Sequence, residues 1–233
     1  MMIGIIGAMD VEVEALKQIM DSVHTRAIST VKYYNGEIKG IKAVVATAGV
    51  GKVNAAVCTQ TMIMEFNPDI IINVGVAGGM SPELGIGDIA VADTVVEHDM
   101  DTTPLGDDMG FITGIDKVYM DCDKKISQIM FDAANEVCGI KVVRGTIASG
   151  DQFIASDEQR SRIINSFKNV VATEMEGASI GHVCTMNNKP FAVLRAISDG
   201  ANSDSHMDFP TFTKLAAKNS IAIILKVFEK LAE

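Results

Sequence analysis

Cysteine is scarce in this sequence, and its spacing excludes two common uses of the residue. The chain has 233 residues and only four cysteines, which are widely spaced and form no Cys-x-x-Cys pair. The four histidines show no metal-binding spacing either. This pattern predicts no disulfide framework and no metal site, and it favours a reducing cytoplasm in which cysteines fill apolar space. The cysteines are Cys58, Cys122, Cys138 and Cys184, and the histidines are His24, His98, His182 and His206.

Positive charge is also in short supply. The formal net charge of -10 argues against a nucleic acid or an anionic membrane as partner. It disfavours a strongly anionic substrate unless Arg and Lys form a local basic pocket. No uncharged apolar run reaches the ~18–20 residues of a membrane span. The first residues lack the basic segment of a signal peptide and soon reach Asp10 and Glu12, so we expect a cytoplasmic protein.

Apolar residues are plentiful, at 48% of the chain, which is enough to bury a substantial core in one α/β domain. Strand-like runs alternate with helix-like periods, and the order predicts a mostly parallel or mixed sheet between helices. The predicted strands are 3–6, 31–38, 41–47, 69–76, 87–96, 142–148, 170–172 and 191–197. The predicted helices are 10–20, 53–66, 124–138, 156–167, 176–186 and 209–230, and residues 98–114 form a loop. The Lys39-Gly40 pair predicts a hairpin turn.

Ligands in such folds bind at the carboxyl ends of the strands. That rule selects the segments 7–12, 47–52, 75–79, 149–154, 170–179 and 195–199. Two nucleotide-binding motifs are excluded there. Gly49-Val50-Gly51-Lys52-Val53 lacks the first glycine and the Ser/Thr of a phosphate loop, and Gly4-Ile5-Ile6-Gly7 is not a dinucleotide fingerprint.

Four acids fall at or just after predicted strand ends: Glu12, Glu174, Glu176 and Asp199. Acids that converge on one apolar edge repel one another and shift in pKa, so that one holds a proton while another is ionised. Acid/base cleavage of a glycosidic bond requires such a pair. The alternative is structural, since Thr173 and Glu176 have capping-box spacing and Asp199 suits a helix N-cap or turn.

Two further strand ends also admit two interpretations. The stretch Gly75-Val76-Ala77-Gly78-Gly79 is either a turn that needs positive φ or a close backbone approach to a ligand. Phe153, one of few aromatic residues, is either a core side chain or a stacking platform for a flat ring.

Five motifs in order give the sequence a family resemblance. They are 4–13 (GIIGAMDVEV), 51–56 (GKVNAA), 149–153 (SGDQF), 174–176 (EME) and 195–199 (RAISD). Together they resemble the 5′-methylthioadenosine/S-adenosylhomocysteine nucleosidases of the nucleoside phosphorylase superfamily, over essentially the whole chain. The resemblance implies one domain over 1–233, a three-layer α/β sandwich with a central mixed, twisted sheet flanked by helices. It also implies hydrolysis of the bond between adenine and a 5′-thio-substituted ribose, in methionine salvage, with no metal or organic cofactor.

The resemblance further implies roles for individual residues. Asp199 matches the general acid that protonates adenine at ring nitrogen 7, and Glu12 matches the group that activates the attacking water. Glu176 matches the acceptor for the ribose 2′- and 3′-hydroxyls. The remaining matches are Ser198, which positions the acid; Arg195, near the water; Met175, against the sugar; Phe153, stacked on adenine; Ile154, whose backbone reads the adenine edge; and Met9 and Phe209, apolar walls near the 5′-thio group. Val76, Ala77 and Gly78 form the glycine-rich turn beneath the sugar.

The sequence departs from the family pattern at two places. Val76 stands where many relatives carry a small hydroxyl residue, and the loop 102–107 lacks the aromatic residues that some relatives place near the 5′ substituent. In the family that loop can come from a neighbouring subunit, so we expect a homodimer with residues 100–114 near the neighbour's site.

Other functions remain open from the residues alone. A phosphorylase on the same fold would need basic groups to hold phosphate, whereas the first loop offers Asp10, Glu12 and Glu14. A hydrolase of a related purine nucleoside, such as futalosine, fits Asp199 equally well. A non-catalytic nucleoside sensor would need neither Glu12 nor Asp199.

Overall fold

The computed structural model describes residues 1–137, 139–199 and 209–232, without the side chains of residues 209–215. The strands are β1 (Met2–Gly7), β2 (Asp21–Ile28), β3 (Val31–Ile38), β4 (Ile41–Thr47), β5 (Ile70–Gly79), β6 (Ile89–Glu97), β7 (Met120–Asp121), β8 (Val142–Ser149), β9 (Val170–Glu174) and β10 (Phe191–Asp199). The helices are α1 (Asp10–Gln18), α2 (Lys52–Phe66), α3 (Lys124–Asn135), α4 (Asp157–Ser166), α5 (Gly177–Met186) and α6 (Phe209–Ala232), with a 3₁₀ turn, η1 (Thr103–Leu105).

All of these strands belong to one mixed sheet. β1 lies between β4 and β5 and runs parallel to both, and β3 and β2 extend the sheet by antiparallel pairing. On the other side, β10 pairs in parallel with β5 and antiparallel with β6. The path β6–β8–β9 then returns to β5, so this half of the sheet closes on itself. The mixed sheet is confirmed, whereas its partial closure was not predicted.

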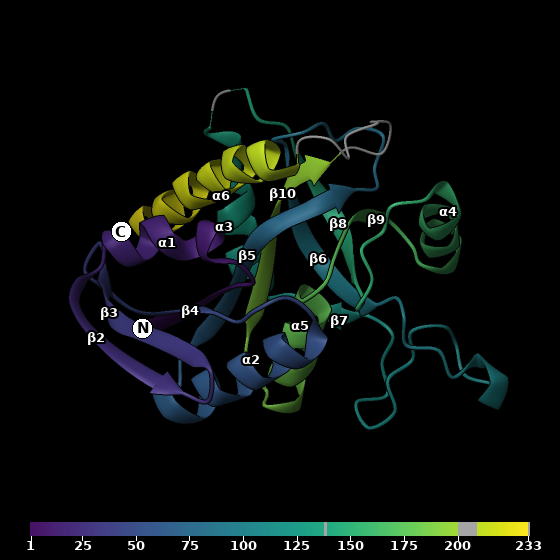
Figure 1. Cartoon of the computed structure of the whole chain (residues 1–233), viewed down its shortest axis with the longest axis horizontal. Coiled ribbons are helices and arrows are strands. Elements are labelled where there is room, and N and C mark those ends of the chain that lie inside the picture. Colours follow the sequence, from purple (N-terminus) through teal and green to yellow (C-terminus); the bar gives the residue numbers. More distant parts are fainter. Residues whose placement is uncertain (138, 200–208, 233) are drawn as a thin grey trace.

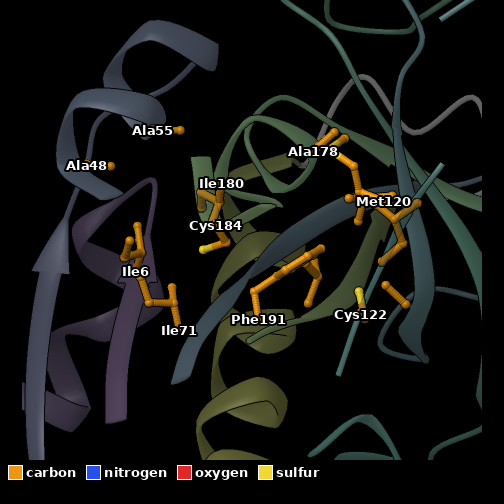
Figure 2. Close-up of a cluster of buried hydrophobic side chains, with 14 of the residues drawn as sticks. Ile6, Ala48, Ala55, Ile71, Met120, Cys122, Ala178, Ile180, Cys184 and Phe191 are labelled. Carbon is orange, nitrogen blue, oxygen red and sulfur yellow. The ribbon is translucent and has the colours of Figure 1, made fainter. Parts of the chain in front are cut away.

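Helices cover both faces of the sheet, which confirms the three-layer sandwich (Figure 1). α1, α3 and α6 pack together on one face, and α2 and α5 pack together on the other. Figure 2 shows part of the second interface, where Ile180 and Cys184 of α5 lie near Phe191 of β10. Burying one such aliphatic or aromatic side chain contributes about 1.5–3 kcal/mol, so these interfaces dominate the stability of the fold.

The apolar pattern of the sequence explains the local structure. β5 is apolar at nearly every position because both of its faces are buried. On α3 the buried residues Ile126, Met130, Ala133 and Ala134 recur at helical spacing. Both residues of the predicted hairpin turn, Lys39 and Gly40, have positive φ between β3 and β4, as a two-residue hairpin turn requires.

The structure corrects the sequence predictions in three places. β2 and β7 were not predicted, and α3 ends at Asn135 instead of continuing to Cys138, which lies outside the described residues. β2 escaped prediction because seven of its eight residues are exposed and show no apolar alternation. Within the described parts of the chain, no helix is long and apolar enough to cross a membrane.

Candidate active site

The selected strand ends meet around one cavity with about 760 Å³ of empty space, which includes its opening to solvent. Each of the six segments contributes at least one residue to its lining. The lining residues are Ala8, Met9, Glu12, Val50, Val76, Ala77, Gly78, Gln152, Phe153, Ile154, Thr173, Glu174, Met175, Glu176, Ser198 and Asp199. The rule that ligands bind at the carboxyl ends of strands therefore selected segments that do converge.

Glu12 lies on the first turn of α1 and is 1% exposed. Its Oε2 accepts hydrogen bonds from the backbone N–H groups of Ala8, at 2.7 Å, and Met9, at 2.8 Å. Its Oε1 accepts from the N–H of Val76 on β5 at 3.0 Å. Burial raises the pKa of Glu12, and the nearby Arg195 guanidinium and these three N–H groups only partly offset that effect. Glu12 is thus held rigidly at the cavity wall with increased affinity for a proton.

Arg195 is completely buried behind the cavity and joins the acids to one another. Its Nη2 pairs with Glu174 Oε2 and lies 3.5 Å from Glu176 Oε2. The same nitrogen donates to the amide oxygen of Asn73, a polar residue within the apolar strand β5. A buried cation needs such partners, because desolvation alone would cost several kcal/mol.

Glu174 performs the capping that the sequence assigned to Thr173 and Glu176. Its carboxylate accepts the backbone N–H groups of Glu176, at 2.9 Å, and Gly177, at 2.8 Å. Ser149 Oγ donates to the same carboxylate and accepts the N–H of Ala178 at 2.7 Å. The Thr173–Glu176 capping box is therefore wrong, since Glu176 as N-cap makes no side-chain cap hydrogen bond.

This arrangement leaves the Glu176 carboxylate available to the cavity. Glu176 is 4% exposed, and its Oε1 accepts the N–H of Gly51 at 2.9 Å. Burial and the neighbouring charge of Glu174 raise the pKa of Glu176 to about 7, although Arg195 acts in the opposite direction. The expected pKa shift among converging acids is thus found at Glu12 and Glu176.

Asp199 ends β10, and its Oδ1 accepts a hydrogen bond from Ser198 Oγ at 2.9 Å. Nη2 of Arg160, on α4, lies 3.9 Å from Asp199 Oδ2. Asp199 approaches β5 closely, since a Cβ atom placed on Gly78 would lie only 3.0 Å from Asp199 Oδ2. Glycine at 78 therefore leaves room for this carboxyl group, which favours close approach over a simple turn.

Apolar side chains complete the cavity. Met9, Val76, Ala77, Ile154 and Met175 all line it. Phe153 lines it as well and is 54% exposed, which excludes a core role for this ring. Phe209 is the first residue of α6, but its side chain lies outside the described residues, so its predicted place beside the cavity stays a prediction.

Several residues around the cavity were not predicted from the sequence. Val50, Ala8, Gln152 and Thr173 line it, and Asn73 and Ser149 support its acids from behind. Only Asn73 gave a signal, as the single polar residue in the run 70–77. Among the described residues, no group of three or more His, Cys, Asp or Glu side chains could hold a metal ion.

The chemistry of the cavity follows from this geometry. Glu12 lies against β5 at Gly75 and Asp199 lies against it at Gly78, so the two carboxyl groups approach different positions of this strand. Two carboxyl groups that line one cavity can serve as acid and base on either side of a scissile glycosidic bond. Buried Glu176 adds a strong acceptor for hydroxyl groups, and exposed Phe153 adds a flat apolar surface.

Known proteins share both the sequence and this structure. The family model of the phosphorylase superfamily matches residues 2–229. A 5′-methylthioadenosine/S-adenosylhomocysteine nucleosidase of Bacillus subtilis (strain 168) is 35% identical over 231 residues, which cover 99% of this chain and 100% of the relative. The enzyme of the same name from Staphylococcus aureus (strain JH9) is 40% identical over 219 residues, covering 94% and 95% of the two chains.

Solved structures agree with these relatives. The nucleosidase of this name from Neisseria meningitidis, in complex with methylthio-immucillin-A, has a TM-score of 0.94 at 35% identity, covering 98% of this chain and 99% of its own. An S-adenosylhomocysteine nucleosidase from Streptococcus pyogenes, in complex with 5-methylthiotubericidin, has a TM-score of 0.93 at 34% identity, covering 99% and 97%. The resemblance seen in the sequence motifs is confirmed, and this chain belongs to the 5′-methylthioadenosine/S-adenosylhomocysteine nucleosidase family of the phosphorylase superfamily.

Proposed function

We propose that this chain hydrolyses the N-glycosidic bond of 5′-methylthioadenosine and S-adenosylhomocysteine, releasing adenine and the 5′-thioribose product. The full-length match to nucleosidases makes it an N-glycosyl hydrolase. The observation that carries the proposal is the cavity itself, which Asp199, Glu12, Glu176 and Phe153 all line. We propose that residues 1–233 act as a single domain.

Asp199 acts as the general acid and donates a proton to ring nitrogen 7 of adenine, which otherwise leaves poorly as an anion. Ser198 Oγ, 2.9 Å from Asp199 Oδ1, fixes the orientation of the acid. Phe153 stacks on the adenine ring, and the backbone of Ile154 reads the edge of the base. The ribose develops oxocarbenium character as the bond breaks.

Glu12 orients the water that attacks the anomeric carbon and accepts its proton. The three N–H groups that hold the Glu12 carboxylate keep this base in place, and burial raises its pKa toward the range of an effective general base. Arg195 lies beside Glu12 and contributes positive charge at this end of the cavity. No cofactor takes part in this scheme.

The sugar is held by Glu176, which accepts hydrogen bonds from the 2′- and 3′-hydroxyls, and by Met175 against the ring. Val76 provides a backbone N–H to Glu12 at 3.0 Å, whereas its side chain adds an apolar surface. Ala77 and Gly78 lie beneath the sugar, and Met9 and Phe209 contact the 5′-thio group.

The second proposal concerns assembly and context. An exposed apolar stripe runs along α2 through Val53, Val57 and Met64. It begins just before the helix at Val50, which also lines the cavity. In Figure 1 the segment that contains η1 extends away from the sheet, and Leu105 on it is 83% exposed. We propose that the stripe forms a homodimer interface and that residues 100–114 lie near the neighbour's site. The enzyme acts in the cytoplasm, in methionine salvage, where Cys58, Cys122 and Cys184 stay reduced.

One experiment tests the reaction. The protein is incubated with methylthioadenosine, S-adenosylhomocysteine, adenosine and inosine, with and without phosphate, and the products are separated by chromatography. We expect free adenine and free thioribose at a rate that does not depend on phosphate. A sugar 1-phosphate would identify a phosphorylase, and binding without any product would identify a sensor; either result overturns the proposal.

A further inference from the structure

Lys52, the first residue of α2, forms a partly buried ionic network that the proposed reaction does not use. Its Nζ lies 3.0 Å from Glu97 Oε2 and 2.7 Å from Asp99 Oδ1, and its side chain is 20% exposed. Glu97 Oε1 lies 3.0 Å from Nδ1 of His182 on α5. Lys52 does not itself line the cavity. The ammonium group therefore ties the start of α2 to the end of β6 from outside the cavity wall.

The backbone next to Lys52 holds the carboxylate of Glu176. The N–H of Gly51 donates to Glu176 Oε1 at 2.9 Å, and Ser179 Oγ donates to the carbonyl of Lys52 at 2.7 Å. Gly51 has a φ of 96°, which favours glycine, and this conformation turns its N–H toward Glu176. The contacts that hold Lys52 in place therefore also hold the neighbouring N–H of Gly51, which orients the Glu176 carboxylate.

The same network reaches the turn that carries Phe153. The N–H of Lys52 donates to Asp151 Oδ1 at 2.8 Å, and the N–H of Asp151 donates to Asp99 Oδ2 at 2.9 Å. Asp99 thus accepts hydrogen bonds both from the Lys52 ammonium and from the turn. Lys52 is connected through one carboxylate to a residue only two positions before Phe153.

The network stays charged at neutral pH. Burial alone would raise the pKa of Asp99 and of Glu97, but contacts with Lys52, and for Glu97 with His182, leave both below their ordinary values. Burial would lower the pKa of Lys52, but its two carboxylate partners raise it overall. Partly buried pairs of this kind are less screened by solvent than surface pairs, so they hold their geometry more firmly.

We propose that Lys52 is a positioning residue, which aligns Glu176 for the ribose hydroxyls through Gly51 and steadies the 149–153 turn through Asp99 and Asp151. The inference rests on the proposed function, because the role of Glu176 toward the sugar is proposed there. Small displacements at a site are costly, since a misplacement of about 1 Å can lower a rate ~10²-fold. A purely structural Lys52 would instead lower activity without changing which substrate groups the enzyme recognises.

The test measures how strongly each variant prefers methylthioadenosine over its 3′-deoxy analogue, as a ratio of kcat/KM values. The wild type should prefer the hydroxylated substrate by about 10- to 100-fold, because the analogue loses a charge-assisted hydrogen bond. In Lys52→Met this preference should fall by about 3- to 10-fold, with a loss of roughly 10-fold or more in kcat/KM for methylthioadenosine itself. Intrinsic differences in the reactivity of the two substrates cancel when variants are compared.

Three controls make the result decisive. Arg144→Met removes a cation of similar exposure, with a side chain that is 26% exposed and pairs with Asp93 at 2.6 Å, and it should leave the preference unchanged. Lys52→Arg keeps the charge and should recover part of the preference. If Lys52→Met does not fold, Asp99→Asn removes one of its partners and should lower the preference in the same direction.

The outcomes separate the two proposals. If Glu176→Gln keeps the wild-type preference, the proposed role of Glu176 toward the sugar fails. If Glu176→Gln abolishes the preference, while soluble Lys52→Met loses activity equally on both substrates, the positioning role of Lys52 is overturned. Unchanged preference in both Lys52→Met and Asp99→Asn would have the same meaning.

Discussion

Glu176 carries the clearest pH signature of any single residue in the site. Burial and the charge of Glu174 raise its pKa to about 7, from an ordinary value of 4.5. Folding therefore favours the protonated form, and Glu176 lowers the stability of the unliganded protein as pH rises from about 4.5 to 7. The proposed hydrogen bonds from the ribose hydroxyls are stronger with the ionised form. The pH range in which Glu176 stabilises the unliganded protein therefore differs from the range in which it should bind the sugar best.

We accordingly expect kcat/KM for methylthioadenosine to rise with pH as Glu176 ionises near pH 7. In Glu176→Gln this rise of kcat/KM with pH should be missing, and the residual activity should depend less on pH near pH 7. The measurement is steady-state kinetics from about pH 5 to 9, with a few pH values in each pH unit and buffers of constant ionic strength. An acid limb that keeps its wild-type midpoint in Glu176→Gln would show that another group titrates there.

Asp199 provides the second prediction at this scale. Loss of a proton donor typically lowers a rate by ~10²–10⁴-fold, so Asp199→Asn should lose about that much in kcat for methylthioadenosine. Ser198→Ala removes the 2.9 Å hydrogen bond to Asp199 and a 3.4 Å one to the carbonyl of Ala77, and a loss of about 5- to 10-fold is expected. Adenine release by Asp199→Asn at the wild-type rate would show that the acid is another group.

Glu174 has a structural role, so its substitution should change stability. Glu174→Gln breaks the buried pair with Arg195 and weakens the cap at Glu176 and Gly177. Breaking such a pair costs about 3 kcal/mol, and at this chain length the Tm should fall by roughly 6–12 °C. Thermal denaturation monitored by circular dichroism measures this change.

Glu14→Gln is the matched control for Glu174→Gln. Glu14 lies 3.6 Å from Lys17 with its side chain 53% exposed, and exposed pairs contribute at most ~1 kcal/mol. The Tm of this variant should stay close to that of the wild type. Equal Tm values for Glu14→Gln and Glu174→Gln would mean that the Arg195 pair does not support the fold.

At the scale of elements, β5 brings the separate acids into one site. A Cβ atom placed on Gly75 would overlap Arg195 Nη1 and lie 2.7 Å from Glu12 Oε1, neither of which can move far in its buried surroundings. We expect Gly75→Ala to displace the Glu12 and Arg195 side chains and to lower kcat at least ~10²-fold.

The overpacking at Gly75 should also destabilise the protein by about 1–3 kcal/mol. Gly85→Ala is a suitable control, since a Cβ there meets only Asp88 Oδ2 at an ordinary 3.5 Å. Kinetics and denaturant unfolding of both variants give the two quantities. Wild-type kcat in Gly75→Ala would show that the site tolerates a shift of this pair.

Elements with a buried apolar face could be predicted from the sequence, whereas β2 and β7 could not. β5 and α3 have strong apolar patterns because one or both faces are buried, and their predicted ranges are close to the observed ones. β2 is held mainly by backbone pairing with β3, with an Arg26–Glu65 ion pair and one core contact at Ile28, and β7 has only two residues. Neither strand therefore has an apolar alternation in the sequence.

The site, too, has a part that could be predicted from the sequence and a part that could not. Chain order and the strand-end rule placed Glu12, Glu176 and Asp199 at one edge, and the cavity contains all three. The partners of these acids could not be predicted, because contacts such as Gly51 to Glu176 join residues 125 positions apart. The side chains of Lys52, Glu97 and His182 gave no sequence signal that they form one network.

At the scale of the whole molecule, the exposed face of α2 bears on the proposed homodimer. Val53, Val57 and Met64 recur at helical spacing and are 73%, 46% and 74% exposed. A stripe of this kind, beginning at the cavity-lining Val50, suits a surface that a second copy covers. The neighbour's 100–114 segment would then lie close enough to this cavity to complete it.

Val57→Asp tests this arrangement, because a buried unpaired carboxylate at the centre of an interface costs several kcal/mol in each half of a symmetric dimer. We expect the wild type to sediment as a dimer and the variant to sediment as a monomer. The variant should also lose at least ~10-fold in kcat/KM, since the neighbour no longer closes the cavity. Ile164→Asp on α4 changes a residue of similar exposure, 49%, away from the stripe, and should remain dimeric and active. A monomeric wild type, or a fully active monomer of Val57→Asp, would show that each chain completes its own site.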